Sequence, residues 1–492
     1  MKSKFVREQK RYTKKELKEI LDCSEADMIR MARRLKEYGV LKTVKNTREQ
    51  RDMTDLAEED FEISTAEEPG DKSLYIFTFV GIIIIEGRIL KCYPKYLSKS
   101  SEPAAELKQI LQVLQKYNTN KQIIQIYYEG GDASVFNRLG IMLFLLGDYY
   151  ENGLYTNMRD IIETNGPGEI HWDETVHNTY PVLVKNKPYY VELQTKKRIQ
   201  DEGDYFQRLH ECVLSVCSME LNEAGLLDLF GMEETKLSDE KPDFFGEDTY
   251  IIYRLEKEMN VQFNTRKQAI LKALASFISN QGAIDDVYNF GIFGTASFNL
   301  VWEKVCAEVM DNQLHTQLGA LNLPGNLVVP ANASYTAENE LIEIIGKPIW
   351  TGYDACRTEF EKEAHKTLAP DLISIYSEQG EFTFAIFDAK YYTVQLEPEK
   401  ALMGQPGVGD ITKQYLYQLA YREFIEANKI SRARNCFLLP TEENAIIEKG
   451  SVRIDMLSAL GLEKIQIRQL PAARMYDCYL RGLKLNMDEL NL

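Results

Sequence analysis

The sequence predicts a mixed α/β (α+β) fold, with a small winged helix-turn-helix at the N-terminus and a larger body of sheets and helices. Three observations predict it. The 492 residues are enough for two to four domains. A hydrophobic fraction of 44% and a charged fraction of 27% are ordinary for globular proteins. Segments with helical spacing also mix with β-branched and aromatic runs, without strict alternation.

Charge divides the chain. The net charge of −17 argues against a polycation that coats nucleic acid. Residues 1–51 nevertheless carry 16 basic and 8 acidic side chains, whereas residues 52–71 carry nine acids and no base. We therefore expect a basic domain over 1–51 and an acidic linker over 52–72. The acidic remainder is expected to form a middle domain over 73–285, which contacts DNA or a partner, and a C-terminal domain over 286–492.

Other features exclude whole classes of protein. The longest apolar runs span about nine residues, far short of the roughly 20 that a membrane-spanning helix needs. The N-terminus lacks the apolar core of a secretory signal. The eight cysteines are scattered without a CxxC pair, as expected for free thiols in a reducing compartment. We expect a cytoplasmic protein without a membrane segment.

Two helix starts define the N-terminal domain. Thr13 and Ser24 each stand three residues before an acid, the pattern of a helix N-cap. We expect helices over 14–21 and from 25 to about 38, followed by a short strand over 40–44. This order of elements is typical of a winged helix-turn-helix.

Basic side chains lie off the apolar stripe of the second expected helix. They are Arg30, Arg33, Arg34 and Lys36. In winged-helix complexes this helix enters the major groove of DNA. The same fold also serves protein contacts, and the sequence leaves both uses open.

The middle domain mixes strands and helices. The run 74–96 is β-rich, and its row of isoleucines predicts a strand buried on both faces. Two strands joined by a turn at 185–188 are expected within 171–191. Helices are expected here and at the start of the C-terminal domain, over 104–116, 139–150, 205–221, 266–280 and 298–309.

Missing motifs exclude several chemistries. The five histidines form no HExxH motif, and the chain has neither a GxSxG motif nor a GxxxxGK[ST] phosphate loop. We therefore expect neither a zinc protease nor a nucleotide bound by this chain itself.

One constellation points to a chemistry. Asp371, preceded by proline, opens an expected strand over 371–376, and a turn leads to a second strand over 382–392. The two-residue period of a strand puts Asp388 and Lys390 on one face, about 6.6 Å apart. The hairpin would bring Asp371 beside Asp388.

These groups suit a metal-dependent phosphodiester hydrolase. The carboxylates of Asp371 and Asp388, with the main-chain carbonyl of Ala389, are the hard oxygen ligands that Mg²⁺ prefers. Such an ion polarises a phosphodiester, and Lys390 orients or deprotonates the attacking water. Glu303 is the first candidate for a third acid, in competition with Glu308, Glu338, Glu340 and Glu343. An ordinary hairpin with a surface salt bridge is the alternative.

A helix is expected to begin near Asp410, after the hairpin. Its Gln414, Gln418 and Tyr421 share one side, from which they could meet a phosphate backbone near the metal. Amphipathic packing explains the same spacing. Gln414 is the nucleic-acid-binding candidate of this helix.

Several fragments resemble one family in the expected order. FVGIIIIEGRILKCYPKY, RLGIMLFLLGDYYENGLYTN, YYVELQTKKRI, SFNLVWEKV and the PD…DAK hairpin are similar to the LlaJI family of restriction endonuclease subunits, which is related to McrC nuclease subunits. The resemblance covers about residues 73–480. The N-terminal helix-turn-helix and the loop 404–410 lie outside the matched fragments.

The resemblance implies a PD-(D/E)xK restriction-endonuclease-like core, with Asp371, Asp388 and Lys390 as the catalytic set and Glu303 as the helix acid. It also implies an McrB-like AAA+ GTPase partner, in agreement with the missing phosphate loop. We therefore expect a Mg²⁺-dependent DNA endonuclease subunit of a prokaryotic restriction or antiphage defence system, acting on double-stranded DNA. The alternative is a non-catalytic DNA-binding adaptor or scaffold subunit. The oligomeric state stays open, with a homo-oligomer among the options.

Overall fold

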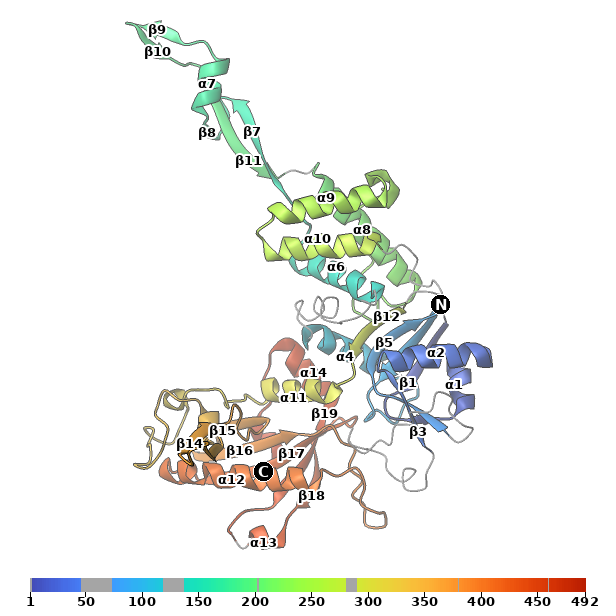
Figure 1. The fold of residues 1–492 in the computed structure, drawn as a ribbon, viewed down its shortest axis with the longest axis vertical. Coiled ribbons are helices and arrows are strands. Elements are labelled where there is room, and N and C mark those ends of the chain that lie inside the picture. Colours follow the sequence, from blue (N-terminus) through green and yellow to red (C-terminus); the bar gives the residue numbers. More distant parts are fainter. Residues whose placement is uncertain are drawn as a thin grey trace. The chain divides into compact units, whose positions relative to one another are not determined.

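The computed structural model describes residues 2–45, 73–117, 137–200, 203–279, 290–378, 380–458 and 460–492. It has a mixed α/β fold with several sheets, as predicted (Figure 1). The chain divides into two compact units, one over 120–292 and the other over 2–119 together with 293–492. The expected acidic linker over 52–72 lies outside the described residues.

A five-stranded sheet forms the C-terminal part of the second unit. Its strands lie in the order β15-β16-β17-β19-β18. Their bounds are Leu372–Glu378 (β15), Glu381–Ala389 (β16), Arg432–Thr441 (β17), Ile447–Val452 (β18) and Ile465–Pro471 (β19). The three central strands run parallel, and each outer strand is antiparallel to its neighbour. The carboxyl ends of β16, β17 and β19 therefore meet at one edge.

Helices cover both faces of this sheet. On one face, apolar side chains of β15 and β16 pack against α12 (Val408–Ala427). That cluster includes Ile373, Ile375, Phe384, Ile386, Tyr417, Tyr421 and Phe424. On the other face lie α11 (Phe298–Val309) and α14 (Ala472–Arg481) (Figure 1). The predicted helix over 298–309 is thus confirmed.

The N-terminal segment shares its sheets with residues 73–93. One sheet has the order β1-β6-β5-β12, and the other has the order β2-β4-β3. The first contains β1 (Lys2–Arg7), β5 (Val80–Ile85), β6 (Arg88–Tyr93) and β12 (Phe290–Thr295). The second contains β2 (Arg11–Tyr12), β3 (Leu41–Lys45) and β4 (Ser73–Phe77). Residues 2–45 therefore take strand partners from beyond the expected linker, and α4 (Ala104–Tyr117) packs against β5.

The two N-terminal helices form where the sequence predicts them. α1 spans Lys14–Leu21 and α2 spans Glu25–Glu37. The hydroxyls of Thr13 and Ser24 accept hydrogen bonds from the main-chain N–H groups three residues on, both at 3.2 Å. The apolar stripe of α2 is buried as expected, which leaves its basic side chains on the outer side.

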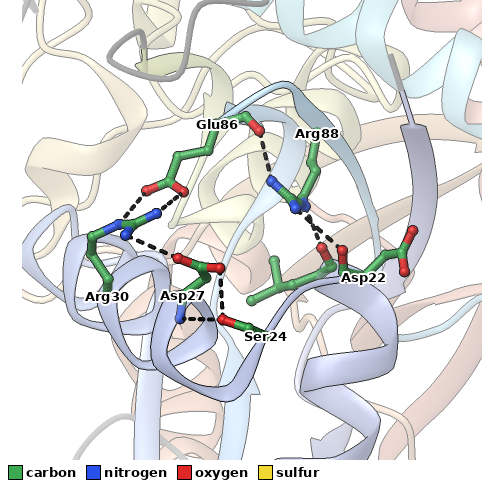
Figure 2. A network of polar contacts seen from close by, with 7 residues as sticks. Asp22, Ser24, Asp27, Arg30, Glu86 and Arg88 are labelled. Carbon is green, nitrogen blue, oxygen red and sulfur yellow. Dashed lines mark hydrogen bonds and ion pairs between the residues drawn. The ribbon is translucent and has the colours of Figure 1, made fainter.

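A polar network ties α2 to the turn between β5 and β6 (Figure 2). Arg30 donates hydrogen bonds of 2.7 and 3.1 Å to the carboxylate of Glu86, and it pairs with Asp27 at 3.0 Å. Arg88 donates to main-chain carbonyls at the C-terminal end of α1. Glu86 is nearly buried, and a buried carboxylate needs a charged or hydrogen-bonding partner. Arg30 is thus engaged in holding α2 against the sheet.

The unit over 120–292 combines helices with a segment of short strands over 158–200, called the arm. Outside the arm, its described part includes α6 (Arg138–Asn152), α8 (Tyr205–Glu223), α9 (Asp248–Val261) and α10 (Thr265–Ser279). In the arm, β11 (Gln194–Gln200) pairs with both β7 (Met158–Thr164) and β8 (Glu169–Ile170). A second hairpin pairs β9 (Val182–Val184) with β10 (Lys187–Tyr189) (Figure 1). In the described part of the chain, no helix has both the length and the apolar character needed to cross a bilayer.

One expectation for the arm is wrong. Residues 172–178 form helix α7 (Trp172–Asn178) instead of a strand. The ring of His171 accepts a 3.3 Å hydrogen bond from the N–H of Glu174, and two acids occupy the first turn, where the helix dipole favours them. The hairpin turn is where the sequence predicts it, because Lys185 and Asn186 have φ of 51° and 60° between β9 and β10.

Strands β5 and β12 approach each other closely at two glycines. A Cβ atom on Gly81 would lie 2.1 Å from the carbonyl oxygen of Phe293, and Gly81 has φ of +142°. We predict that Gly81→Ala lowers the free energy of unfolding by about 1–3 kcal/mol, the usual cost of overpacking. Urea denaturation measures the change. Gly346→Ala is the control, since no atom lies within 4 Å of its Cβ position. Equal effects of both substitutions would contradict the prediction.

Candidate active site at the end of β16

The predicted catalytic residues converge at the carboxyl end of β16. Asp388 is the second-to-last residue of β16, Lys390 follows the end of that strand, and Asp371 directly precedes β15. The register of the hairpin places Asp371 opposite Asp388. The main-chain N–H of Ala389 donates a 2.8 Å hydrogen bond to the carboxylate of Asp371. The expected pairing of the two aspartates across the hairpin is what the geometry shows.

Lys390 lies between two carboxylates. Its ammonium nitrogen is 3.0 Å from Oδ1 of Asp388 and 3.3 Å from Oδ1 of Asp410, at the start of α12. Among the described residues, the buried Oδ1 of Asp388 finds no hydrogen bond of good geometry besides this ion pair. Burial alone would lower the pKa of Lys390, but the charges of Asp388 and Asp410 outweigh it and raise the pKa. The lysine is therefore a cation at neutral pH.

The two aspartates form a coupled pair. Burial, the charge of Asp388 and a hydrogen bond between the two carboxyls together raise the pKa of Asp371 to about 8. Two carboxylates at such close range cannot both ionise out of water at low cost. The pair must therefore share a proton or a cation.

Glu303 on α11 is the third acid near this pair. Burial raises the pKa of Glu303, Lys390 opposes this, and the charge of Asp388 adds to it. Its competitors have other surroundings. Glu308 pairs with Lys304, Glu340 pairs with His315, Glu343 accepts from the N–H of Glu340, and Glu338 is exposed. The structure thus favours Glu303 among the five glutamates.

The donor set fits a hard divalent cation. The pair Asp371 and Asp388, with the carbonyl of Ala389, supplies the oxygen ligands that Mg²⁺ takes, and Oδ1 of Asp388 is a buried acceptor without a hydrogen bond. Within the described ranges, no three His, Cys, Asp or Glu side chains gather closely enough to hold a metal by themselves. Two carboxylates and one carbonyl would leave the other coordination positions of such an ion to water, as is usual for Mg²⁺.

Gln414 of α12 is fully buried between the helix and the sheet. Its main-chain carbonyl accepts a 2.8 Å hydrogen bond from Asn435. Neither atom of its side-chain amide has a hydrogen-bond partner among the described residues. Leaving a buried amide without hydrogen bonds costs about 1–3 kcal/mol. Its contact with nucleic acid stays a prediction.

Two neighbours of the site were not among the predicted residues. Asp410 holds Lys390, as described above. Tyr417 donates a 2.7 Å hydrogen bond to the carbonyl of Ala369, and burial together with Asp388 and Asp371 raises its pKa to about 12. The spacing of seven residues between Asp410 and Tyr417 on one helix is the signal that places both on the side facing the hairpin.

The basic candidates on α2 differ in their surroundings. Arg33 is exposed, whereas Arg34 and Lys36 are half-buried. The ammonium of Lys36 lies 5.8 Å from the ring centroid of Tyr75, and burial lowers its pKa. Arg30 is exposed but bound to Glu86 and Asp27. Arg33 is therefore the best placed of the four to meet an external anion.

Comparison with known proteins gives matches over most of the chain. The model of the LlaJI restriction endonuclease family matches residues 79–327 and 331–472. The type II restriction enzyme BsuMI component YdjA of Bacillus subtilis (strain 168) is 28% identical over 432 residues, which cover 84% of this chain and 83% of the relative.

Two solved structures show weaker similarity. One is a half-complex of Thermococcus gammatolerans McrB AAA+ hexamers with bound McrC, with 9% identity, a TM-score of 0.37 and coverage of 98% of this chain and 99% of that one. The other is the McrBC complex of the same organism, with 12% identity, a TM-score of 0.24 and coverage of 61% and 85%.

The family match includes α11, the β15–β16 hairpin and α12, and so it contains every residue gathered at the end of β16. It begins after the two N-terminal helices. The chain belongs to the LlaJI restriction endonuclease family.

Proposed function

We propose that this chain is the Mg²⁺-dependent DNA endonuclease subunit of a prokaryotic restriction or antiphage defence system, with a core of the PD-(D/E)xK type. The observation that carries the proposal is the convergence of Asp371, Asp388 and Lys390 in a chain of this family. Asp371, Asp388 and the carbonyl of Ala389 would hold the ion. When bound, Mg²⁺ polarises a phosphodiester and lowers the pKa of a coordinated water.

The surroundings of each side chain set its proposed role. Lys390 is kept charged by Asp388 and Asp410, so it orients the attacking water and offsets the negative charge that develops on the phosphate. A cationic lysine is a poor base. Glu303, whose pKa burial raises, is then the better candidate to accept a proton from the water.

The arm supports a protein partner. Several large apolar side chains of the arm are exposed to solvent, and exposed apolar side chains that lie together often mark an interaction surface. The most exposed are Tyr180 (96%), Val191 (73%), Leu183 (67%) and Met158 (64%). We propose an McrB-like AAA+ GTPase as the partner, because the sequence resembles McrC-related subunits and carries no phosphate loop.

The second candidate function is a non-catalytic DNA-binding adaptor or scaffold. Two observations favour it. The ammonium of Lys390 already has two carboxylate partners, and the described residues contain no three-acid metal cluster. In that function the basic α2 binds DNA as part of a winged helix, and the buried charges at the end of β16 only stabilise the fold.

Cleavage of double-stranded DNA separates the two functions. We predict that Asp388→Asn reduces cutting by about a thousandfold, because loss of a metal ligand removes several kcal/mol of transition-state stabilisation. Plasmid cleavage by the full chain with its GTPase partner, GTP and Mg²⁺ measures this. Asp311→Asn is the control, since that exposed residue forms a surface ion pair with Lys484, at 3.1 Å. Undiminished cutting by Asp388→Asn would refute the site, and an inactive parent chain would favour the adaptor.

The coupled aspartates predict a pH dependence of Mg²⁺ use. Below pH about 8, Asp371 holds a proton in the absence of a cation. A metal must displace that proton, so the Mg²⁺ concentration that half-saturates cleavage should fall by roughly tenfold per pH unit as the pH rises towards about 8. Cleavage rates measured against Mg²⁺ concentration at several pH values test this. A half-saturating concentration that does not change with pH would contradict it.

The exposed Arg33 predicts a salt-dependent contribution to DNA binding. We expect Arg33→Ala in the full chain to weaken binding and to reduce the slope of log affinity against log salt by about one. Fluorescence anisotropy over a range of salt concentrations measures the slope. Lys15→Ala, an exposed cation on α1, is the matched control. If Arg33→Ala has the same slope as the parent chain, Arg33 does not contact DNA.

A further inference from the structure

The residue after the catalytic lysine is tied to the N-terminal segment. The side chain of Tyr391 is buried, at 8% exposure. Its hydroxyl donates a 2.5 Å hydrogen bond to Oε2 of Glu8, which lies between β1 and β2 and is 4% exposed. A carboxylate from the start of the chain is therefore buried against the neighbour of Lys390, 383 residues further on.

The segment around Lys95 completes this contact. The main-chain N–H of Lys95 lies 3.2 Å from both Oε2 of Glu8 and the hydroxyl oxygen of Tyr391. The ammonium of Lys95 lies 4.8 Å from the ring centroid of Tyr391 and donates a 3.0 Å hydrogen bond to Gln9. Arg7 in turn donates a 2.9 Å hydrogen bond to the carbonyl of Lys95. Residues 7–9 and Lys95 are thus joined to one another by hydrogen bonds, and together they contact Tyr391.

Aromatic packing fixes the ring of Tyr391. Its centroid lies 5.3 Å from that of Phe298 and 6.3 Å from that of Tyr96, in tilted and edge-to-face arrangements. Phe298 is the first residue of α11, the helix that carries Glu303. The same tyrosine therefore joins the N-terminal segment, the catalytic strand and the helix of the third acid.

The main chain at Lys390 is held from the other side by β17. The N–H of Lys390 donates a 3.0 Å hydrogen bond to the carbonyl of Leu438. The indole of Trp302 on α11 donates to the same carbonyl at 3.1 Å. Successive side chains of an extended chain point to opposite faces, so Lys390 faces the aspartates while Tyr391 points to the opposite, packed side.

We propose that Glu8 and Tyr391 are positioning residues for Lys390, so that the N-terminal segment forms part of the nuclease site. This inference rests on the proposed function. A lysine side chain has many rotamers, and its ammonium is held in place only if its main chain is fixed. The β17 hydrogen bond fixes one side of that main chain, and the Tyr391–Glu8 hydrogen bond fixes the other. A change in the conformation of the N-terminal segment, which precedes the family-matched residues, would thereby alter the position of Lys390.

Amide hydrogen exchange tests the proposal without relying on activity. We expect Glu8→Ala and Tyr391→Phe to speed exchange in a peptide that covers residues 388–392 by about tenfold or more. Glu8→Gln should restore the protection, because its side-chain oxygen still accepts from Tyr391 and Lys95. Tyr12→Phe is the matched control. It removes a buried hydroxyl of the same N-terminal segment that accepts from Arg7 at 2.8 Å. Unchanged exchange in Tyr391→Phe would overturn the proposal.

Cleavage kinetics of the full complex give the functional readout. We expect Glu8→Ala and Tyr391→Phe to lower kcat by about tenfold with KM for DNA unchanged, and Glu8→Gln to cut within about threefold of the parent chain. A rise in KM alone would overturn the proposal, because it would place Glu8 in substrate binding. If Glu8→Ala does not fold, Tyr391→Phe and Glu8→Gln still decide between the outcomes. An inactive parent chain with faster exchange in Tyr391→Phe would refute the proposed function and leave the positioning contact intact.

Discussion

The structure at the end of β16 depends on one electrostatic constraint. Two aspartates are buried close together, and a single ammonium group lies beside them. Asp371 and Asp388 face each other across the hairpin, and burial raises the pKa of Asp371 to about 8. Lys390 compensates Asp388 at 3.0 Å and Asp410 at 3.3 Å. Three aspartates beside one ammonium leave an excess of negative charge that a bound cation can offset. The parallel strands supply the frame, since their carboxyl ends meet at one edge and bring distant residues together.

The same principle governs how the N-terminal segment is attached. Glu86 and Glu8 are nearly buried carboxylates, and each has a partner from another part of the chain. Arg30 of α2 binds Glu86, and Tyr391 binds Glu8. A buried charge that loses its partner is strongly destabilising, so these contacts hold the segment in register with the sheets. The basic helix α2 therefore belongs structurally to the unit that contains the candidate site.

Local sequence signals predicted the local structure well. The caps at Thr13 and Ser24, the helix over 298–309 and the hairpin that carries Asp388 all lie where spacing and turn chemistry place them. Within 171–191, where two strands are expected, residues 172–178 form a helix that the side chain of His171 caps. Local signals do not predict which segments pair when they are far apart in the sequence. Nothing local indicates that β1 pairs with β6 or that Glu8 reaches Tyr391. Helical spacing places Asp410 and Tyr417 on one side of α12, but only the fold shows that this side meets Lys390.

Binding of a divalent cation by the chain alone tests the central claim most directly. Mn²⁺ substitutes for Mg²⁺ at sites built from oxygen ligands, and electron paramagnetic resonance counts the free ion. We predict about one tightly held Mn²⁺ per chain at pH 8, displaced by Mg²⁺ and lost in Asp371→Asn. Absence of a bound ion in the parent chain, or unchanged binding in Asp371→Asn, would contradict the account.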